Sequence, residues 1–303
     1  MDTEKLRILE AAAAAQSLSA AGEQLGYTTS GISRAIASLE EEMGFPLFIR
    51  GRRGVTMTAE CRRILPEVRK VLHAEELLLQ EAGAIRGLES GTLSIGCAYG
   101  GYYRKYLSET VQNFTARHPE IQIELFQGTS SELMKQLKEG RGDLCLVSWR
   151  EGDFRWIPLA QEPLKAVVPA GHPLAGHAQT GHSLAGRSQG DRAQVGAYPI
   201  ARFAEDAYID LYPEEETDNS RMLQREGIRP RTRYACTDVL AALGMVEAGM
   251  GVVLVNEGYL EHWQGQTAAL PLDPPQLVEI GLAVPADRAA SPVLRQFLSE
   301  SGL

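Results

Sequence analysis

A run of apolar residues at helical spacing lies between Thr58 and Gly87, and no other feature of the sequence constrains the fold as strongly. Its main row alternates steps of four and three residues and has one polar position, Glu75, among Ile64, Val68, Val71, Leu78, Ala82 and Ile85. A second row repeats every seven residues and consists of Leu65, Leu72 and Leu79. This heptad spacing predicts one long helix that pairs with a second copy of itself. The alternative is an amphipathic helix that packs only on its own domain.

The residues before this helix are predicted to form three short helices and a hairpin. Ser17 or Ser19 is suited to cap the second helix, and Gly26 to end it. Thr28 is suited to cap the third helix, which would end at Gly44 and bury Ile32, Ile36 and Leu39. Residues 46–58 are too short and too rich in Gly and Arg for a further helix, so we expect a small β-hairpin.

The segment from Ser17 to Glu40 has the pattern of a helix-turn-helix. Ala20 and Ala21 allow two helices to cross closely, and Gly26 allows the tight turn. The next helix would present residues that can contact base edges or phosphates: Thr28, Thr29, Ser30, Ser33 and Arg34. The hairpin adds a predicted wing against the DNA backbone or in the minor groove, with Arg50, Arg52 and Arg53. Taken alone, such a hairpin is more simply interpreted as a solvated turn.

Charge limits how this module can bind its predicted partner, double-stranded DNA. The chain of 303 residues carries a net charge of -9. This charge excludes binding of nucleic acid through the overall electrostatic attraction of the whole protein. A local basic patch still acts independently, because salt screens charges over about 8 Å. Acidic side chains also outnumber basic ones within residues 1–60, so few phosphates would be neutralised by each copy. We therefore expect DNA binding to require a dimer or a tetramer.

From Gly91 onward the sequence alternates between strand and helix patterns. Strands are predicted at residues 92–98, 121–127 and 144–147, and helices at 103–117 and 131–139. This order indicates a mostly parallel sheet with right-handed crossovers. A second α/β unit is predicted to start near Ala166, and a strand at 276–284 to return to the first unit. The expected division is a DNA-binding domain at 1–58, a linker helix at 59–89 and an effector-binding domain at 90–303, with lobe I at 90–163 and 266–303 and lobe II at 164–265.

Small ligands of two-lobed α/β proteins bind at the carboxyl ends of strands, near the crossover between the lobes. The candidates at such positions are Tyr99, Gly100, Gly101, Tyr102, Thr129, Ser130, Ser148, Trp149, Arg202, Phe203 and Thr237. Hydroxyls at helix starts and an arginine favour a small carboxylate effector, aromatic acids included. The alternatives are plain: Thr129 and Thr237 could be only helix caps, Tyr102 and Trp149 core residues, and Arg202 the partner of a surface carboxylate.

The segment SLSAAGEQLGYTTSGISRAIASLEEEMGFPLFIRGRRGVTMT resembles the N-terminal module of the LysR-type transcriptional regulators. The resemblance rests on the Ala-Ala pair, Leu25, Ser33-Arg34, Ile36, Leu39-Glu40, Gly44, Leu47-Phe48, Arg50 and Thr58. The long helix and the two-lobed remainder also have the order and lengths of that family. Gly22, Thr29-Ser30-Gly31 and Glu60-Cys61 depart from its common pattern.

The resemblance implies a bacterial regulator that responds to a small-molecule effector. The expected fold is α/β overall, with an N-terminal winged helix-turn-helix, a long linker helix and a C-terminal two-lobed domain similar to periplasmic binding proteins. The resemblance also implies a homodimer or homotetramer assembled through the linker helix, and it leaves RNA polymerase open as a further partner.

Other residue patterns exclude several classes of function. Four cysteines lie far apart, and the spacing of His172, His177 and His182 in a Gly-rich loop is poor for a metal, so we expect neither a metal site nor a cofactor. The acidic run from Glu214 to Asp218 is predicted to be a solvated surface. The sequence has no pattern of an export signal or a spanning helix, which indicates a cytoplasmic protein. A small-molecule-binding protein without regulatory DNA binding and an enzyme remain the alternatives.

Overall fold

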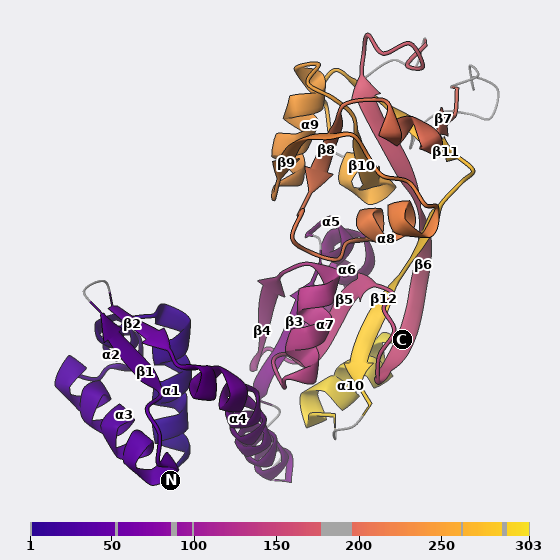
Figure 1. Cartoon of the computed structure of the whole chain (residues 1–303). Helices are drawn as coiled ribbons and strands as arrows, with labels where there is room; N and C mark the ends of the chain where they lie inside the picture. The colour runs from indigo at the N-terminus through magenta and orange to yellow at the C-terminus, as the bar shows by residue number, and fades with distance from the viewer. Residues whose placement is uncertain are drawn as a thin grey trace.

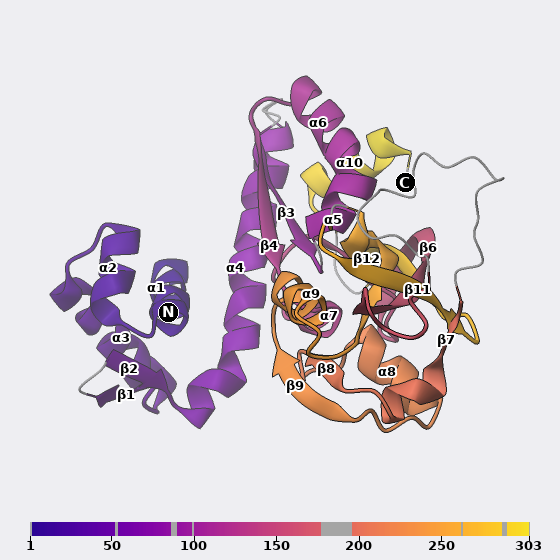
Figure 2. The ribbon, with the colours of Figure 1, turned by 90° about the horizontal axis from the view of Figure 1, so that it is seen from above.

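The computed structural model describes residues 2–51, 54–85, 90–98, 100–176, 196–261, 263–286 and 290–302. An N-terminal module leads into one long helix, which is followed by an elongated α/β part (Figure 1). Figure 2 shows the long helix, α4, standing between the N-terminal module and the α/β part. This arrangement confirms the fold class predicted from the sequence.

The N-terminal module contains three helices and a two-stranded hairpin. The helices are α1 (Thr3–Ala15), α2 (Leu18–Leu25) and α3 (Thr29–Met43), and the strands are β1 (Phe48–Gly51) and β2 (Gly54–Met57). Ser17 and Thr28 cap α2 and α3 through their hydroxyl oxygens, and Gly26 and Gly44 end these helices in the left-handed conformation. The predicted helix boundaries in this module are therefore confirmed, because local capping signals set them.

Gly22 is explained by the crossing of the helices of this module. A Cβ atom at Gly22 would lie 2.7 Å from the backbone oxygen of Tyr27, at the turn between α2 and α3. That oxygen cannot move without breaking the turn, so the position excludes a side chain. Glycine lowers the helix propensity at this position by up to about 1 kcal/mol. It is nevertheless required here, because only glycine allows the backbone of Tyr27 to lie so close to α2.

The linker helix α4 (Ala59–Ile85) begins after Thr58, whose hydroxyl oxygen accepts a hydrogen bond from the N–H of Cys61. Leu65, Val68 and Leu72 are buried in the core of the N-terminal module. Further along the same helix, Leu78, Leu79 and Ile85 are 68%, 61% and 81% exposed. The first half of the helix therefore packs on its own module, and its second half presents an uncovered apolar stripe. Pairing of this second half with another copy stays a prediction.

Lobe I is a sheet with helices on both faces. Its strands are β3 (Gly91–Cys97), β4 (Ile121–Gln127), β5 (Leu144–Ser148) and β12 (Leu277–Pro285). The helical turns α5 (Gly100–Tyr102) and η1 (Tyr103–Leu107) lead into α6 (Ser108–Arg117), which covers one face together with α10 (Pro292–Ser301). Helix α7 (Ser130–Lys138) covers the other face, where Leu133 and Leu137 pack on Cys145 and Val147.

Strand β6 (Phe154–Pro169) links the two lobes and adds antiparallel pairings to the predicted topology. Its first half pairs with β12, and its second half pairs with β10 (Val253–Asn256) and β11 (Thr267–Asp273). All of these pairings are antiparallel, whereas β3 is parallel to β4 and β5. The predicted parallel order is thus confirmed for β3, β4 and β5, whereas the antiparallel pairs of β6 with β10, β11 and β12 were not predicted. The sequence pattern missed β6 because a strand that crosses between lobes has no single alternation of buried and exposed residues.

Lobe II is built around the second half of β6. Its further elements are β7 (Tyr198–Pro199), η3 (Ile200–Ala204), β8 (Tyr208–Leu211), α8 (Asp218–Arg225), β9 (Thr232–Cys236), α9 (Val239–Glu247) and η4 (Glu257–Leu260). Strand β8 is parallel to β9 and contacts the start of β10 in the same direction. The carboxyl ends of β8 and β10 therefore point the same way, toward the gap between the lobes.

Candidate functional site

The N-terminal end of α3 forms an exposed polar face. Thr28, Thr29, Ser30 and Arg34 are exposed, and Ser33 is half-buried. The Thr28 hydroxyl oxygen accepts the N–H of Gly31 at 3.1 Å, and Arg34 donates weakly to the backbone oxygen of Ser30 at 3.4 Å. The face thus combines short hydroxyl side chains, one cation and the positive end of a helix, which suit base edges and phosphates.

The hairpin is attached to this face by side-chain contacts. Arg50 of β1 donates to the Ser33 hydroxyl oxygen at 2.9 Å, so the first wing strand and α3 share one polar surface. The carboxylate of Glu40 accepts the N–H groups of Leu47 and Phe48 at 2.7 and 3.2 Å, which holds the chain that enters the hairpin. Arg52 and Arg53, predicted as wing contacts, lie outside the described residues.

A cavity of about 300 Å³ lies between the lobes, at the carboxyl ends of their strands. Its lining from lobe I includes Ala98, Tyr102, Gln127, Thr129, Ser130 and Arg150, and from lobe II Leu211, Tyr212, Thr217, Asp218 and Asn256. Polar groups from both lobes therefore surround a space of small-molecule size. The position at the strand ends is the one that the sequence predicted.

Four of the predicted effector residues lie at this cavity. Tyr102, Thr129 and Ser130 line it, and Thr129 is at the same time the N-cap of α7. The hydroxyl of Ser148 is hydrogen-bonded to that of Ser130 at 2.9 Å, although Ser148 itself is only 1% exposed. Tyr102 accepts a hydrogen bond from the Asn256 amide of lobe II, and burial raises the pKa of its phenol well above the usual value.

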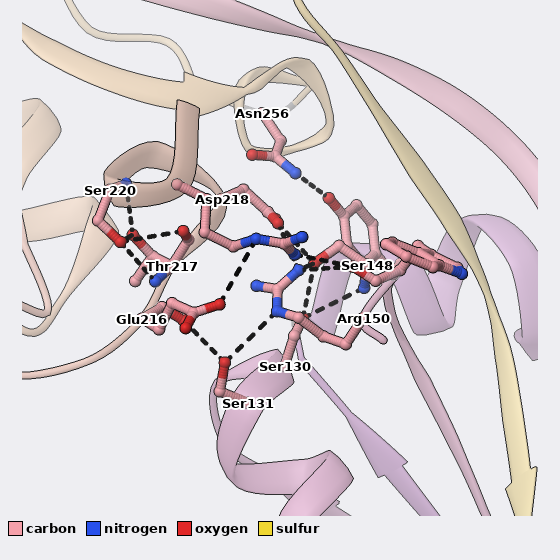
Figure 3. Close-up of polar contacts among 12 residues, drawn as sticks. Ser130, Ser131, Ser148, Arg150, Glu216, Thr217, Asp218, Ser220 and Asn256 are labelled. Atoms are coloured by element: carbon pink, nitrogen blue, oxygen red, sulfur yellow. Dashed lines mark hydrogen bonds and ion pairs between the residues drawn. The ribbon is translucent and has the colours of Figure 1, made fainter. Parts of the chain in front are cut away.

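The ion pair at the cavity was not predicted from the sequence. Arg150 follows β5 and forms an ion pair with Asp218 of α8, with 2.7 Å between Nη1 and Oδ1 (Figure 3). The Arg150 side chain is only 8% exposed. Asp218 was predicted to belong to a solvated acidic run, and this prediction is wrong because α8 begins at the cleft. Its position at the first turn of a capped helix was the only local signal.

Other predicted residues lie away from the cavity. Phe203 is fully buried in the lobe II core, and the guanidinium of Arg202 pairs with Asp206 at 3.1 Å. Thr237 is exposed and precedes Asp238, which is the actual N-cap of α9. These three placements correct the prediction, because η3 packs inward and the cap lies one residue later. Gly100 and Gly101 belong to helical turn α5, Trp149 borders a second cavity of about 510 Å³, and Tyr99 lies outside the described residues.

A buried carboxylate forms a second connection between the lobes. Glu162, near the middle of β6, is 2% exposed and accepts hydrogen bonds from Lys105 at 2.8 Å and Tyr106 at 2.6 Å. Its other oxygen accepts the N–H of Gly258 in η4 at 3.1 Å. Burial, followed by the hydrogen bond to Glu162, raises the pKa of Tyr106 to about 12. Tyr106 thus remains a donor over the physiological pH range.

The histidines and acidic side chains of the described residues do not gather around a metal. Among these residues, no group of three or more His, Cys, Asp or Glu side chains could hold a metal ion. His172 instead contacts Asp206 at 3.3 Å, whereas His177 and His182 lie outside the described residues. No helix of the described chain is both long enough and apolar enough to cross a membrane.

Comparison with known proteins identifies both parts of the chain. Residues 3–62 match the family of bacterial regulatory helix-turn-helix proteins of the lysR type, and residues 86–301 match the LysR substrate binding domain. The uncharacterized regulator YvbU of Bacillus subtilis is 24% identical over 98% of this chain and 97% of its own length. The regulator CbbR of Sinorhizobium medicae is 32% identical over 56% of this chain and 55% of its own.

Solved structures share the fold along the whole chain. A full-length OxyR variant from Pseudomonas aeruginosa has a TM-score of 0.66 at 20% identity and covers 99% of this chain and 94% of its own. CbnR complexed with its target DNA has a TM-score of 0.64 at 19% identity and covers 100% and 99%. The matched family consists of transcriptional regulators and not of enzymes. The chain belongs to the LysR family of DNA-binding transcriptional regulators.

Proposed function

We propose that this regulator is switched by a small carboxylate, aromatic acids included, that binds in the cavity between its lobes. The observation that carries the proposal is the cavity of about 300 Å³ at the strand ends, with Arg150 and the Ser130–Ser148 hydroxyls on one side and Asn256 on the other. A buried guanidinium beside hydroxyl donors favours an anion. Tyr102 and Tyr212 offer aromatic surface to the remainder of the ligand.

The proposed DNA contacts lie on the exposed face of α3 and on the hairpin. Thr28, Thr29, Ser30, Ser33 and Arg34 would enter the major groove, and Arg50 would contact the backbone beside it, with Arg52 and Arg53 as further wing contacts. CbnR, which shares the fold, is known in a complex with its target DNA. Operator DNA is thus the proposed partner of this surface.

The apolar stripe on the second half of α4 is the proposed contact between two copies. Leu78, Leu79 and Ile85 are uncovered in the single chain, and their spacing is that of a helix pair. Two copies joined in this way would place two α3 helices on one operator, which compensates for the few basic residues of each module.

The switch is proposed to operate through movement of the lobes. An effector that binds one arrangement of the lobes more tightly shifts the population toward it, and with it the spacing of the paired DNA modules. The coupling is reciprocal. If the effector tightens operator binding, the operator must tighten effector binding by the same factor.

A fluorescence titration tests this proposal. Purified full-length protein is titrated against a labelled fragment from upstream of its own gene and against a scrambled fragment of equal length, at near-physiological salt. We expect preferential binding of the upstream fragment, and a change in that affinity on addition of individual carboxylate metabolites. Equal, weak and salt-sensitive binding to both fragments would contradict the operator assignment. An unchanged affinity with every carboxylate would contradict the effector class.

A further inference from the structure

Two buried donors of lobe I converge on a single oxygen of lobe II. Asp218 Oδ1 accepts a hydrogen bond from Arg150 Nη1 at 2.7 Å and another from Ser148 Oγ at 2.9 Å (Figure 3). Arg150 Nη1 also contacts the backbone oxygen of Trp149 at 2.9 Å, which restricts where the guanidinium can point. The cavity lies beside this point, because Arg150 and Asp218 both line it.

The hydroxyl protons around Asp218 have one consistent arrangement. A carboxylate only accepts, so the single proton of the Ser148 hydroxyl points at Asp218. The hydrogen bond between the hydroxyls of Ser148 and Ser130 must then be donated by Ser130. The Ser130 oxygen in turn accepts the backbone N–H of Ser148 at 3.2 Å. This chain of hydrogen bonds therefore runs from the backbone through Ser130 and Ser148 and ends on one acceptor, the Asp218 carboxylate oxygen.

The acceptor belongs to the other lobe and is one of several contacts across the cleft. Asp218 is the first residue of α8, and its neighbour Glu216 accepts the Ser131 hydroxyl proton at its backbone oxygen, at 2.9 Å. Arg221 of the same helix donates to the backbone oxygen of Trp149 at 3.0 Å. The contact between Asp218 and Arg150 differs from these two, because it joins opposite charges inside the cavity wall.

We propose that the Asp218 side chain occupies the carboxylate-binding position formed by Arg150 and Ser148. An effector carboxylate would then bind at this position by displacing Asp218. The inference rests on the proposed function, since it concerns the same cavity. A ligand carboxylate can replace the Asp218 carboxylate without leaving the buried guanidinium uncompensated. A neutral amide lacks the charge, and an amine would pair with Asp218 but leave Arg150 without an anion. The exchange would also break the ion pair that connects the lobes. Binding of the effector would therefore be coupled to movement of the lobes.

The inference is tested by adding a small anion to a variant that lacks the Asp218 carboxylate. Formate carries the atoms that Asp218→Ala removes, and formamide is its neutral counterpart. The midpoint of thermal unfolding of the full-length protein is measured against formate concentration at constant ionic strength. We expect formate to bind Asp218→Ala about tenfold more tightly than the parent, because the internal competitor is gone. Formamide should not distinguish the two proteins.

The matched control is Glu214→Ala, which removes one negative charge from the same acidic run at an exposed position. It should respond to formate like the parent, and Arg150→Gln combined with Asp218→Ala should lose the formate response. If Asp218→Ala does not fold, Asp218→Ser replaces it, because this substitution also removes the carboxylate. Formate binding that is no tighter in the vacated variant than in the parent overturns the inference. Operator binding by the parent is measured separately, so that result leaves the proposed regulator function standing.

Discussion

The guanidinium of Arg69 in α4 and the carboxylate of Glu139 lie 3.0 Å apart and join the linker helix to the C-terminal end of α7. Arg69 also pairs with Glu10 of α1 at 3.0 Å. One side chain therefore connects the DNA-binding module with the helix whose other end, at Thr129 and Ser130, lines the cavity.

Arg69→Gln is expected to destabilise the protein by about 1–2 kcal/mol, because it leaves two carboxylates without their shared charge-assisted donor. The midpoint of urea unfolding measures the effect. Lys70→Gln is the matched control, since Lys70 pairs with Glu67 on an exposed part of the same helix and its loss should cost less than about 0.5 kcal/mol. Equal effects of the two variants would show that Arg69 does not hold the parts together.

Arg34→Ala is expected to weaken binding to the operator by about 1–3 kcal/mol and to reduce the preference over scrambled DNA, if the guanidinium reads a base. Titrations with both fragments measure the two quantities. Arg117→Ala removes an equal charge from the α/β part, where Arg117 pairs with Glu300, and should leave both unchanged. An unaltered preference in Arg34→Ala would place base reading elsewhere on α3.

Arg50→Ala is expected to act differently, because a phosphate contact carries no sequence information. Binding to operator and scrambled fragments should weaken alike, and the slope of log affinity against log salt should fall by about one. The slope is obtained by repeating the titration at several salt concentrations. A selective loss of operator binding alone would argue for base contact by Arg50.

The apolar stripe of α4 leads to a prediction on assembly. The double substitution Leu78→Glu and Ile85→Glu places charges on the exposed stripe, and we expect it to convert dimers into monomers that still fold. Sedimentation velocity measures the mass, and Lys70→Glu serves as a charge control at another exposed position of this helix. A double variant that stays dimeric would mean that copies associate through a different surface.

The four cysteines are expected to differ in reactivity. Burial raises the pKa of the Cys61 thiol to about 11, so at pH 8 only about one molecule in a thousand carries the reactive thiolate. Cys97 and Cys145 are also buried, whereas Cys236 is partly exposed. A disulfide reagent at pH 8 should therefore modify Cys236 first, and Cys236→Ser should remove this fast phase. Fast reaction of the Cys236→Ser variant would reveal opening of a core.

The N-terminal module could be predicted nearly residue by residue because its signals are local. Ser17 and Thr28 cap the helices that follow them, and Gly26 and Gly44 end helices in a conformation that glycine adopts readily. Each signal acts within one turn of helix, so no distant residue can override it easily. The linker helix was predictable for the same reason, since its apolar rows have a single period.

The cavity could be located from strand ends, but its chemistry could not. Thr129 and Ser130 were found because each strand end is followed by a helix start. Arg202 and Phe203 satisfied the same pattern and lie elsewhere, because the direction of η3 depends on packing in lobe II. Arg150 and Asp218 are 68 positions apart along the chain. No local pattern indicates that they meet.

The sequence by itself determined the family, the helix-turn-helix and the long linker helix, because capping, periodicity and small-residue contacts are encoded within short windows. The tertiary structure alone decided the antiparallel part of the sheet, the division of α4 into a buried and an exposed half, and the pairing of Arg150 with Asp218. These features depend on contacts between segments that lie far apart in the sequence. A charge in an apparently solvated acidic run thereby becomes part of a buried cavity wall, since burial is a property of the folded chain.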